Sequence, residues 1–352
     1  KVLNANIIFI GPSAKTIKLM GNKILARESI KKYNVPILPG SNKIKNISDG
    51  VKISKQIGFP ILIKAAAGGG GKGMRIVKKQ EDFNDAYNIA KSEALSSFGD
   101  GDVFIEKFLQ NPRHIEVQIL ADNYGNIIHL FERECSIQRR HQKVVEEAPS
   151  VALSHKQRDE ICECAKRVAM SCKYVGAGTV EFLFDKNKFY FLEMNTRIQV
   201  EHPITEMLTR IDLVREQICV AAGEKIIFSQ ENVKPLGHSI ECRINAENPK
   251  DFKPSAGSIK MYHPPAGNGI RLDTFIYSGY KVPHYYDNLL AKLIVTGRTR
   301  NHAIKRALRA LNEMIIDGIE TNIELHKKIL SSKDFKKGAV SIKWLEDNMA
   351  SL

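Results

Sequence analysis

The residues of this 352-residue chain best suited to chemistry lie in the stretch 189–202, which reads FYFLEMNTRIQVEH. Its first half alternates aromatic and aliphatic residues, which is typical of a β-strand, and this strand ends in Glu193 and Asn195. Carboxylate and amide oxygens are the ligands that Mg²⁺ prefers. Arg197 and Glu201 follow as a cation and a base suited to holding a small anion. The alternative interpretation is a solvated loop whose charges only keep it hydrated.

A further carboxylate, Glu181, lies on the preceding predicted strand, 179–184. A three-residue loop between the strands would place Glu181 opposite Glu193, whereas a two-residue turn at 186–187 would place them on opposite faces. Facing carboxylates repel each other unless a cation lies between them. The first register therefore predicts a divalent metal completed by Asn195 and nucleotide phosphates, and the second makes Glu181 a solvent-side residue of a sheet edge.

A glycine run at 68–73 joins two predicted strands, 61–65 and 74–78. Without β-carbons, the backbone N–H groups of such a loop can approach phosphate oxygens closely, and Lys64 would lie beside them. The run is not a dinucleotide fingerprint because a strand follows it instead of a helix, and it is not a Walker A loop because no Ser or Thr follows its lysine. A flexible linker is the alternative, and we favour phosphate binding.

Three further segments could contribute to a nucleotide site. Lys23 lies in the first turn of a predicted helix, 22–33. The helix dipole disfavours a cation at this end, so a bound anion would explain a lysine at this position. The predicted strand 103–109 could serve as a hinge whose backbone pairs with an adenine edge. The charged segment 132–147 is either a salt-bridged helix face or a loop over a cleft, and we favour the loop, which offers His141 and Lys143 to an anion.

Composition excludes several classes of protein. The net charge of +14 suggests an anionic partner, but no basic run is interleaved with aromatic residues, so we expect no nucleic-acid binding. The six cysteines form no CxxC pair, which argues against a zinc or redox motif and for reduced thiols in a cytosol-like compartment. No apolar run reaches about 18 residues, so we expect no membrane span. The pattern also predicts a buried strand over 5–11 and one helix over 203–222.

Taken together, the motifs closely resemble those of the biotin carboxylase family of ATP-grasp enzymes, over essentially the whole chain. The strings that carry the resemblance are GGGGKGMR at 68–75, EKFL at 106–109, RHQKVVEEAP at 140–149, EMNTRIQVEH at 193–202 and ECRINAE at 241–247. Phe108, where the family often has Tyr, and Lys72, where Arg is common, preserve shape or charge.

The resemblance implies an α/β (α+β) chain with an ATP-grasp fold, a glycine-tipped lid lobe and a C-terminal β-rich lobe. The implied domains are the remnant of an N-terminal α/β domain at 1–35, the lid lobe at 36–109, the catalytic core at 110–235 and the C-terminal lobe at 236–352. It further implies that the family's N-terminal portion is truncated, which would affect folding and activity. We expect a cytoplasmic location, or an organelle stroma or matrix if a targeting segment was removed.

The implied reaction uses ATP to activate bicarbonate as carboxyphosphate, from which the carboxyl group passes to biotin on a carrier protein. The implied ATP-binding residues are Lys23, Lys64, Gly70, Gly71, Glu106, Lys107, Phe108, Leu109, His114 and His141. The implied ligands of two Mg²⁺ or Mn²⁺ ions are Glu181, Glu193 and Asn195. The implied bicarbonate site consists of Lys143, Arg197, Gln199, Val200 and Glu201, with Glu201 as the base. Arg197 would stabilise charge on biotin, and Arg243 and Asp287 would lie at the biotin end.

The resemblance also implies partners. A biotin carboxyl carrier protein and carboxyltransferase subunits are expected, because the chain has no Met-Lys biotin acceptor motif, and a homodimer is expected as well. The first half-reaction of acetyl-CoA carboxylase in fatty acid synthesis is the favoured role. The alternatives are the corresponding component of propionyl-CoA or pyruvate carboxylase, or another ATP-grasp ligase such as the bicarbonate-phosphorylating half of carbamoyl phosphate synthetase.

Overall fold

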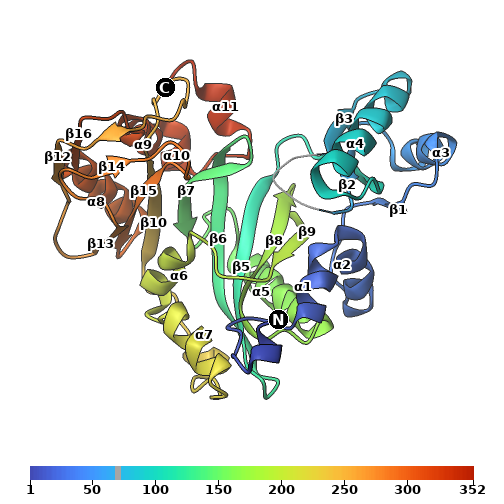
Figure 1. The fold of residues 1–352 in the computed structure, drawn as a ribbon, viewed down its shortest axis with the longest axis horizontal. Coiled ribbons are helices and arrows are strands. Elements are labelled where there is room, and N and C mark those ends of the chain that lie inside the picture. The colour runs from blue at the N-terminus through green and yellow to red at the C-terminus, as the bar shows by residue number, and fades with distance from the viewer. Residues whose placement is uncertain (68–72) are drawn as a thin grey trace.

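The computed structural model describes residues 1–67 and 73–352 and confirms the predicted mixed α/β class. Figure 1 shows a large central sheet, a smaller lobe on one side of it that carries β2, β3 and α4, and a C-terminal segment on the other side. None of the described helices is long and apolar enough to cross a membrane.

The smaller lobe is an antiparallel four-stranded sheet covered by two helices. Its strands, in spatial order, are β1 (Gly40–Lys43), β4 (Val103–Lys107), β2 (Ile61–Ala65) and β3 (Met74–Val77), and its helices are α3 (Ile47–Ile57) and α4 (Phe83–Phe98). Phe83 lies fully buried in its core, so close to Gly50 of α3 that a β-carbon there would come within 2.4 Å of the ring. The lobe therefore has an apolar core of its own.

The central sheet has eight strands, and every neighbouring pair is antiparallel. In spatial order they are β13 (Ile270–Thr274), β15 (Leu289–Gly297), β10 (His238–Asn245), β7 (Gln142–Ala148), β6 (Ile127–Arg139), β5 (Arg113–Ala121), β8 (Gly176–Asp185) and β9 (Lys188–Asn195). The predicted domain boundary at 235/236 falls between β9 and β10 along the chain, yet β10 pairs with β7 in the same sheet. The boundaries stay a prediction.

Helices cover the sheet and supply its two main apolar clusters. α5 packs over β5 and β6, and its first residue follows Ser154, which forms a capping box with Gln157. α8 and α9 build the second cluster against β10 and β15. The helix bounds outside the smaller lobe are α1 (Ala14–Gly21), α2 (Lys23–Ile30), α5 (His155–Ser171), α6 (His202–Thr209), α7 (Leu213–Ala221), α8 (Arg300–Glu313), α9 (Ile323–Ser331), α10 (Lys333–Lys337) and α11 (Trp344–Asn348).

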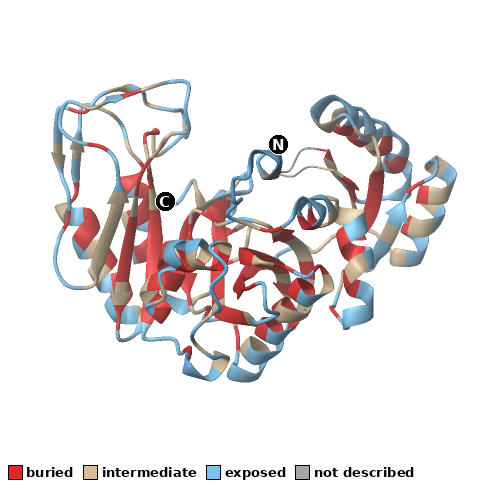
Figure 2. Ribbon diagram, turned by 60° about the horizontal axis from the view of Figure 1, so that its bottom comes forward, coloured by how far each residue is buried: buried red, intermediate tan, exposed pale blue. Residues whose placement is uncertain are grey.

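Short elements complete the chain. They are the 3₁₀ turns Leu3–Ala5, Lys31–Tyr33, Gln80–Asp82 and Gln230–Asn232, and the two-stranded pairs β11 (Gly257–Ser258) with β14 (Lys281–Val282) and β12 (Met261–His263) with β16 (Ile315–Asp317). Figure 2 shows buried residues concentrated on the sheets and on the inward sides of the helices.

Three predictions about elements are wrong. Residues 5–11 form no strand, because no described strand pairs with them, and Ile7 to Ile10 are exposed. The helix predicted over 203–222 is two helices, since Arg210 adopts a left-handed conformation and Asp212 caps a new helix. The segment 132–147 is neither a helix nor a loop: it forms most of the β6–β7 hairpin, with Arg140 and His141 at the tip.

Candidate active site

A cleft of about 1200 Å³ lies between the smaller lobe, the central sheet and the C-terminal segment. Gly70 and Gly71 lie outside the described residues, and all other predicted site residues line this cleft. They are Lys23, Lys64, Glu106, Lys107, Phe108, Leu109, His114, His141, Lys143, Glu181, Glu193, Asn195, Arg197, Gln199, Val200, Glu201, Arg243 and Asp287. The cleft thus brings together residues from both sheets.

The register of the β8–β9 hairpin places Glu181 and Glu193 opposite each other. The turn contains two residues, Lys186 and Asn187, both with positive φ, and this length alone would put the carboxylates on opposite faces. A bulge between Glu181 and Phe182 shifts the pairing by one residue and restores the facing pair. The facing arrangement is confirmed, but the expectation that a two-residue turn would separate the two is wrong.

The facing pair belongs to a longer row of charged residues across four strands. Glu181 is also opposite Glu116 on β5, and Glu116 is opposite Arg133 on β6. Three carboxylates, from Glu193 through Glu181 to Glu116, therefore stand side by side on one face of the sheet. Like charges in such positions destabilise a sheet unless cations neutralise them.

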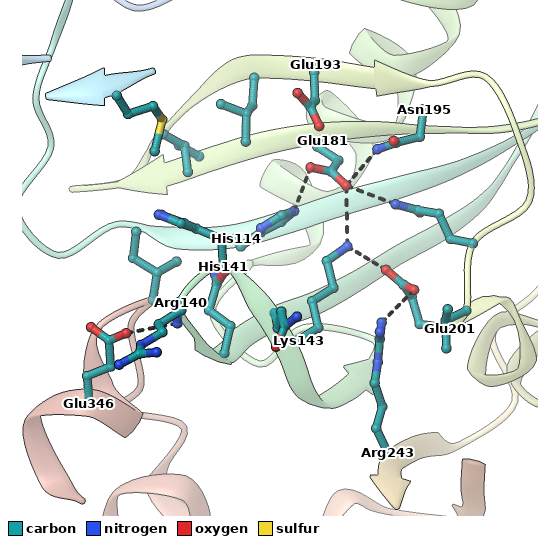
Figure 3. Close-up of a pocket in the computed structure, with 18 of the residues that line it drawn as sticks. His114, Arg140, His141, Lys143, Glu181, Glu193, Asn195, Glu201, Arg243 and Glu346 are labelled. Carbon is teal, nitrogen blue, oxygen red and sulfur yellow. Dashed lines mark hydrogen bonds and ion pairs between the residues drawn. The ribbon is translucent and has the colours of Figure 1, made fainter. Parts of the chain in front are cut away.

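Lys143 on β7 is the cation shared by most of this row. Its ammonium group donates hydrogen bonds to Glu116, to Glu181 at 3.3 Å and to Glu201. Figure 3 shows Lys143 between Glu181 and Glu201, with Arg243 beyond Glu201. Glu181 also accepts hydrogen bonds from Asn195 and Gln199, at 2.8 and 2.9 Å, and lies 3.2 Å from the His114 ring.

The charges of this array are mutually dependent. Burial raises the pKa of Glu116, but Lys143 and Arg133 outweigh burial and lower the pKa to about 2. The pKa of Glu181 is also held below its usual range, because Lys143 and His114 outweigh the effect of burial. Burial lowers the pKa of Lys143, and the surrounding carboxylates more than reverse this. Glu116 and Glu181 therefore stay ionised and Lys143 stays charged at neutral pH.

Arg133 is a fully buried residue that the sequence reasoning missed. Its guanidinium donates to Glu116 at 2.6 Å and to Gln199 at 2.8 Å, and it also reaches Gln118, Thr179 and Thr205. Arg133 thereby fixes Gln199, one of the predicted bicarbonate residues, from behind the cleft.

At the opposite end of the array, Glu201 lies between two cations. One carboxylate oxygen accepts from Lys143, and the other accepts from Arg243 at 2.9 Å. Arg243 also donates to the buried Glu146 at 2.6 Å. Among the described residues no ion pair joins Arg197 to Glu201; Arg197 is exposed, and its guanidinium reaches the backbone oxygen of Ile198.

The cleft wall formed by the smaller lobe holds a second buried ion-pair group. Glu106 accepts from Arg27 and from Lys64, the latter at 2.9 Å, and burial of the group is nearly complete. Lys107 donates to the backbone oxygens of Gly58 and Phe59. Both side chains are therefore engaged within the protein, and the backbone N–H groups of Lys107 and Phe108 donate to the backbone oxygens of Pro39 and Pro60.

The predicted metal ligands present oxygen atoms that fit a hard divalent cation. The amide nitrogen of Asn195 donates to Glu181. The amide oxygen of Asn195 is not used in that bond and lies 3.5 Å from the guanidinium of Arg197. Glu193 is half-buried and forms an ion pair with Lys23 at 3.1 Å. Facing carboxylates with an adjacent amide oxygen are a donor set that Mg²⁺ or Mn²⁺ prefers.

A signal for the missed residues does exist in the sequence. Glu116 and Arg133 lie on strands in which polar and apolar residues are mixed, and Glu116 shares one face of β5 with His114 and Gln118. A charged residue at an inward-facing position of such a strand needs a buried partner. The pattern marks each residue as unusual but does not say which strand supplies its partner.

The chain is similar to known proteins over most of its length. The family model "Carbamoyl-phosphate synthase L chain, ATP binding domain" matches residues 22–228, and the model "Biotin carboxylase C-terminal domain" matches residues 241–347. Biotin carboxylase 1 of Bacillus subtilis is 52% identical over 345 residues, which cover 97% of this chain and 77% of that protein.

Two solved structures are similar over nearly all of the chain. A crystal structure titled as a biotin carboxylase–β,γ-ATP complex from Campylobacter jejuni has a TM-score of 0.96 and 46% identity, covering 98% of this chain and 78% of that one. The biotin carboxylase domain dimer of Hydrogenobacter thermophilus 2-oxoglutarate carboxylase, with MgADP, ADP and bicarbonate, has a TM-score of 0.94 and 47% identity. The match covers 99% of this chain and 77% of that one.

Replacing Arg133 with Met should lower the free energy of unfolding by about 3–5 kcal/mol, because the buried Glu116 would keep only Lys143 of its two cations and the buried oxygens of Gln118, Thr179, Thr205 and Gln199 would lose their donor. Urea unfolding followed by circular dichroism measures the change. Arg215→Met is the matched control: Arg215 is exposed and paired with Glu216, so its loss should leave the free energy of unfolding nearly unchanged. Equal losses in the two variants would contradict the role given to Arg133.

Proposed function

This chain belongs to the biotin carboxylase family of ATP-grasp enzymes and is an ATP-dependent ligase, and from that premise we propose which residues carry the reaction. The family reaction carboxylates biotin with ATP and bicarbonate through carboxyphosphate. ATP and Mg²⁺ or Mn²⁺ are its cofactors, and biotin enters as a carrier-bound substrate.

The observation that carries the proposal is the position of Glu201. Its carboxylate is buried at the cleft wall, with one oxygen on Lys143 and the other on Arg243. The two cations also attract the bicarbonate anion toward Glu201. Glu201 can then remove the proton of bicarbonate while Lys143, Gln199 and the backbone of Val200 hold its oxygens, which makes bicarbonate a better nucleophile.

We assign the nucleotide to the part of the cleft between the smaller lobe and β8–β9. Lys23, Lys64, His114 and His141 would bind phosphates, and the segment 106–109 would hold the base. Gly70 and Gly71 are assigned to the phosphates from the sequence motif alone. The bicarbonate oxygen attacks the γ-phosphorus, ADP leaves, and carboxyphosphate forms in the same cleft.

Glu181, Glu193 and Asn195 would hold the divalent cation. When bound, the cation neutralises charge on the phosphate oxygens and on the facing carboxylates. Lys23 now forms an ion pair with Glu193 and would be released toward the phosphates once the metal takes over that carboxylate. The same carboxylate thus suits a lysine in one state and a metal in the other.

The C-terminal end of the cleft is assigned to biotin. Arg243 lies there within 2.9 Å of Glu201, and Asp287 is exposed at the rim. Arg197 is exposed in the cleft, so it is available to stabilise negative charge on biotin as its N1′ is deprotonated. The carboxyl group passes from carboxyphosphate to that nitrogen, and inorganic phosphate leaves.

For partners we propose a biotin carboxyl carrier protein, carboxyltransferase subunits and a second copy of this chain. The relatives named simply biotin carboxylase support the first half-reaction of acetyl-CoA carboxylase. Propionyl-CoA or pyruvate carboxylase is the second candidate, supported by the similar domains of 2-oxoglutarate and pyruvate carboxylases. Assaying the carboxylated carrier with each carboxyltransferase and acceptor would decide between them.

Glu201→Gln should reduce bicarbonate-dependent ATP hydrolysis by about 10²–10⁴-fold, since the amide is isosteric but cannot accept the proton. ATP affinity should change little because Glu201 lies away from the assigned nucleotide residues. Phosphate release, measured with and without bicarbonate and free biotin, reports the reaction. Glu224→Gln, at an exposed position, is the control. Unchanged hydrolysis in Glu201→Gln would remove this residue from the role of base.

Glu193→Gln should weaken Mn²⁺ binding in the presence of ADP by about tenfold or more, since even groups that only orient a metal ligand contribute about that much. Titration followed by electron paramagnetic resonance measures free Mn²⁺ directly. The same Glu224→Gln variant should bind Mn²⁺ as the parent does. An unaltered affinity in Glu193→Gln would exclude this carboxylate from the metal site.

A further inference from the structure

Behind the proposed base lies a pair of carboxyl groups that the reaction described above does not use. Glu241 on β10 is directly opposite Glu146 on β7, and both side chains are completely buried. Residues directly opposite on antiparallel strands have β-carbons about 5 Å apart and project to the same face. Two ionised carboxylates at this spacing without a cation between them would destabilise the sheet.

The two carboxyl groups differ in their hydrogen bonds. One oxygen of Glu146 accepts from Nε of Arg243 at 2.6 Å. Among residues 1–67 and 73–352, the other oxygen of Glu146 and both oxygens of Glu241 have no hydrogen-bond partner, although all three are buried. Unsatisfied buried polar atoms are costly, and a proton placed between the two carboxyl groups would satisfy two of them at once.

Within the part of the chain that the structure describes, no cation pairs with Glu241. The titratable and charged groups that act on the pair are Arg243 and Cys242 on β10, Lys143 on β7, Cys135 on β6, Lys292 on β15 and Glu201. The helix α6, which packs against β7 and β10, carries His202 and Glu206. Arg243 is engaged by Glu146 and Glu201, and Lys292 donates to the backbone oxygen of Val200 and pairs with Asp273.

The pKa values of Glu241 and Glu146 are consistent with one proton held by the pair. Burial and the neighbouring Glu146 raise the pKa of Glu241 well above its usual range. Burial also raises the pKa of Glu146, to about 7, against the opposing attraction of Arg243. The two carboxyls titrate as a pair, and the proton belongs on Glu241 because the guanidinium is bound to Glu146.

We propose that Glu241 is a positioning residue: as a neutral carboxylic acid it donates its proton to Glu146, and so fixes Glu146 on Arg243 and Arg243 on Glu201. The proposal rests on the role of Glu201 proposed above. Glu241 touches neither bicarbonate nor biotin and acts through two intervening side chains. A carboxylate held by a donor on one oxygen and a guanidinium on the other has its orientation fixed.

The consequence of losing this donor can be stated with its sign. Without Glu241, one oxygen of Glu146 would be buried and unpaired, which favours the protonated form of Glu146 and raises its pKa further. Protonated Glu146 no longer anchors Arg243, and Glu201 then loses one of its two cations. As the pH is lowered, a variant without Glu241 would therefore lose activity at a higher pH than the parent does.

Two substitutions at Glu241 test whether this position needs a neutral hydrogen-bond donor or a negative charge. Glu241→Gln keeps a neutral donor, so the KM for bicarbonate and the pH profile should stay within about twofold of the parent. Glu241→Leu removes the donor with little change in volume. It should raise the KM for bicarbonate by about tenfold, the order expected for one charge-assisted hydrogen bond, and move the acid limb of the profile to higher pH.

Infrared difference spectroscopy of the parent against Glu241→Gln gives a readout that needs no turnover. The parent should show the C=O stretch of a protonated carboxyl group near neutral pH, and this band should be missing from the Gln variant. If Glu241→Leu fails to fold, the band and the activity of Glu241→Gln decide the question together.

Three outcomes would overturn the proposal: no protonated-carboxyl band assigned to Glu241, equal losses in Gln and Leu variants, or a Leu variant with the KM and pH profile of the parent. Failure of the proposed function has a different signature, since the parent itself would then show no bicarbonate-dependent hydrolysis. The infrared band would still report the protonation of Glu241 in that case.

Discussion

The cleft depends on one electrostatic constraint, which is that three carboxylates stand side by side on one face of an antiparallel sheet. Glu193, Glu181 and Glu116 occupy directly opposed positions on β9, β8 and β5. Such a row is tolerated only if cations are built around it, and Lys143 and Arg133 meet this need from β7 and β6. The same charges that stabilise the sheet also prepare the cleft for phosphates, a divalent metal and bicarbonate.

Backbone geometry makes the row possible. A bulge beside Glu181 sets the register that turns it toward Glu193, and the antiparallel pairing of β10 with β7 brings Arg243 to the same face as Glu201. The strands that carry Glu116, Lys143 and Glu181 have little freedom to move, because each has a hydrogen-bonded neighbouring strand on both sides. The smaller lobe, with its own apolar core, presents Lys64 and the segment 106–109 to this fixed surface.

Much of the site could be predicted from the sequence because its residues sit in a few short, distinctive motifs. Glu193 and Asn195 end one strand, so their joint position follows from local spacing alone. The facing of Glu181 could not be decided, since turn length gave the wrong register and the bulge that corrects it leaves no clear mark in the sequence. Glu146 was missed because its partner Arg243 comes from a strand distant in sequence. Arg133 was missed because three of its partners, Thr179, Gln199 and Thr205, are also distant in sequence. The exposed segment 5–11 was misjudged because apolar residues alone do not supply a neighbouring strand.

The central claim is that bicarbonate attacks ATP beside Glu201 to form carboxyphosphate. The most direct test uses bicarbonate labelled with ¹⁸O, together with ATP, Mg²⁺ and biotin, followed by mass analysis of the inorganic phosphate. In this mechanism one bicarbonate oxygen becomes bonded to the γ-phosphorus and remains there when the carboxyl group leaves. The account predicts one labelled oxygen per phosphate released. Phosphate released without label would mean that water attacks ATP, which would contradict the mechanism.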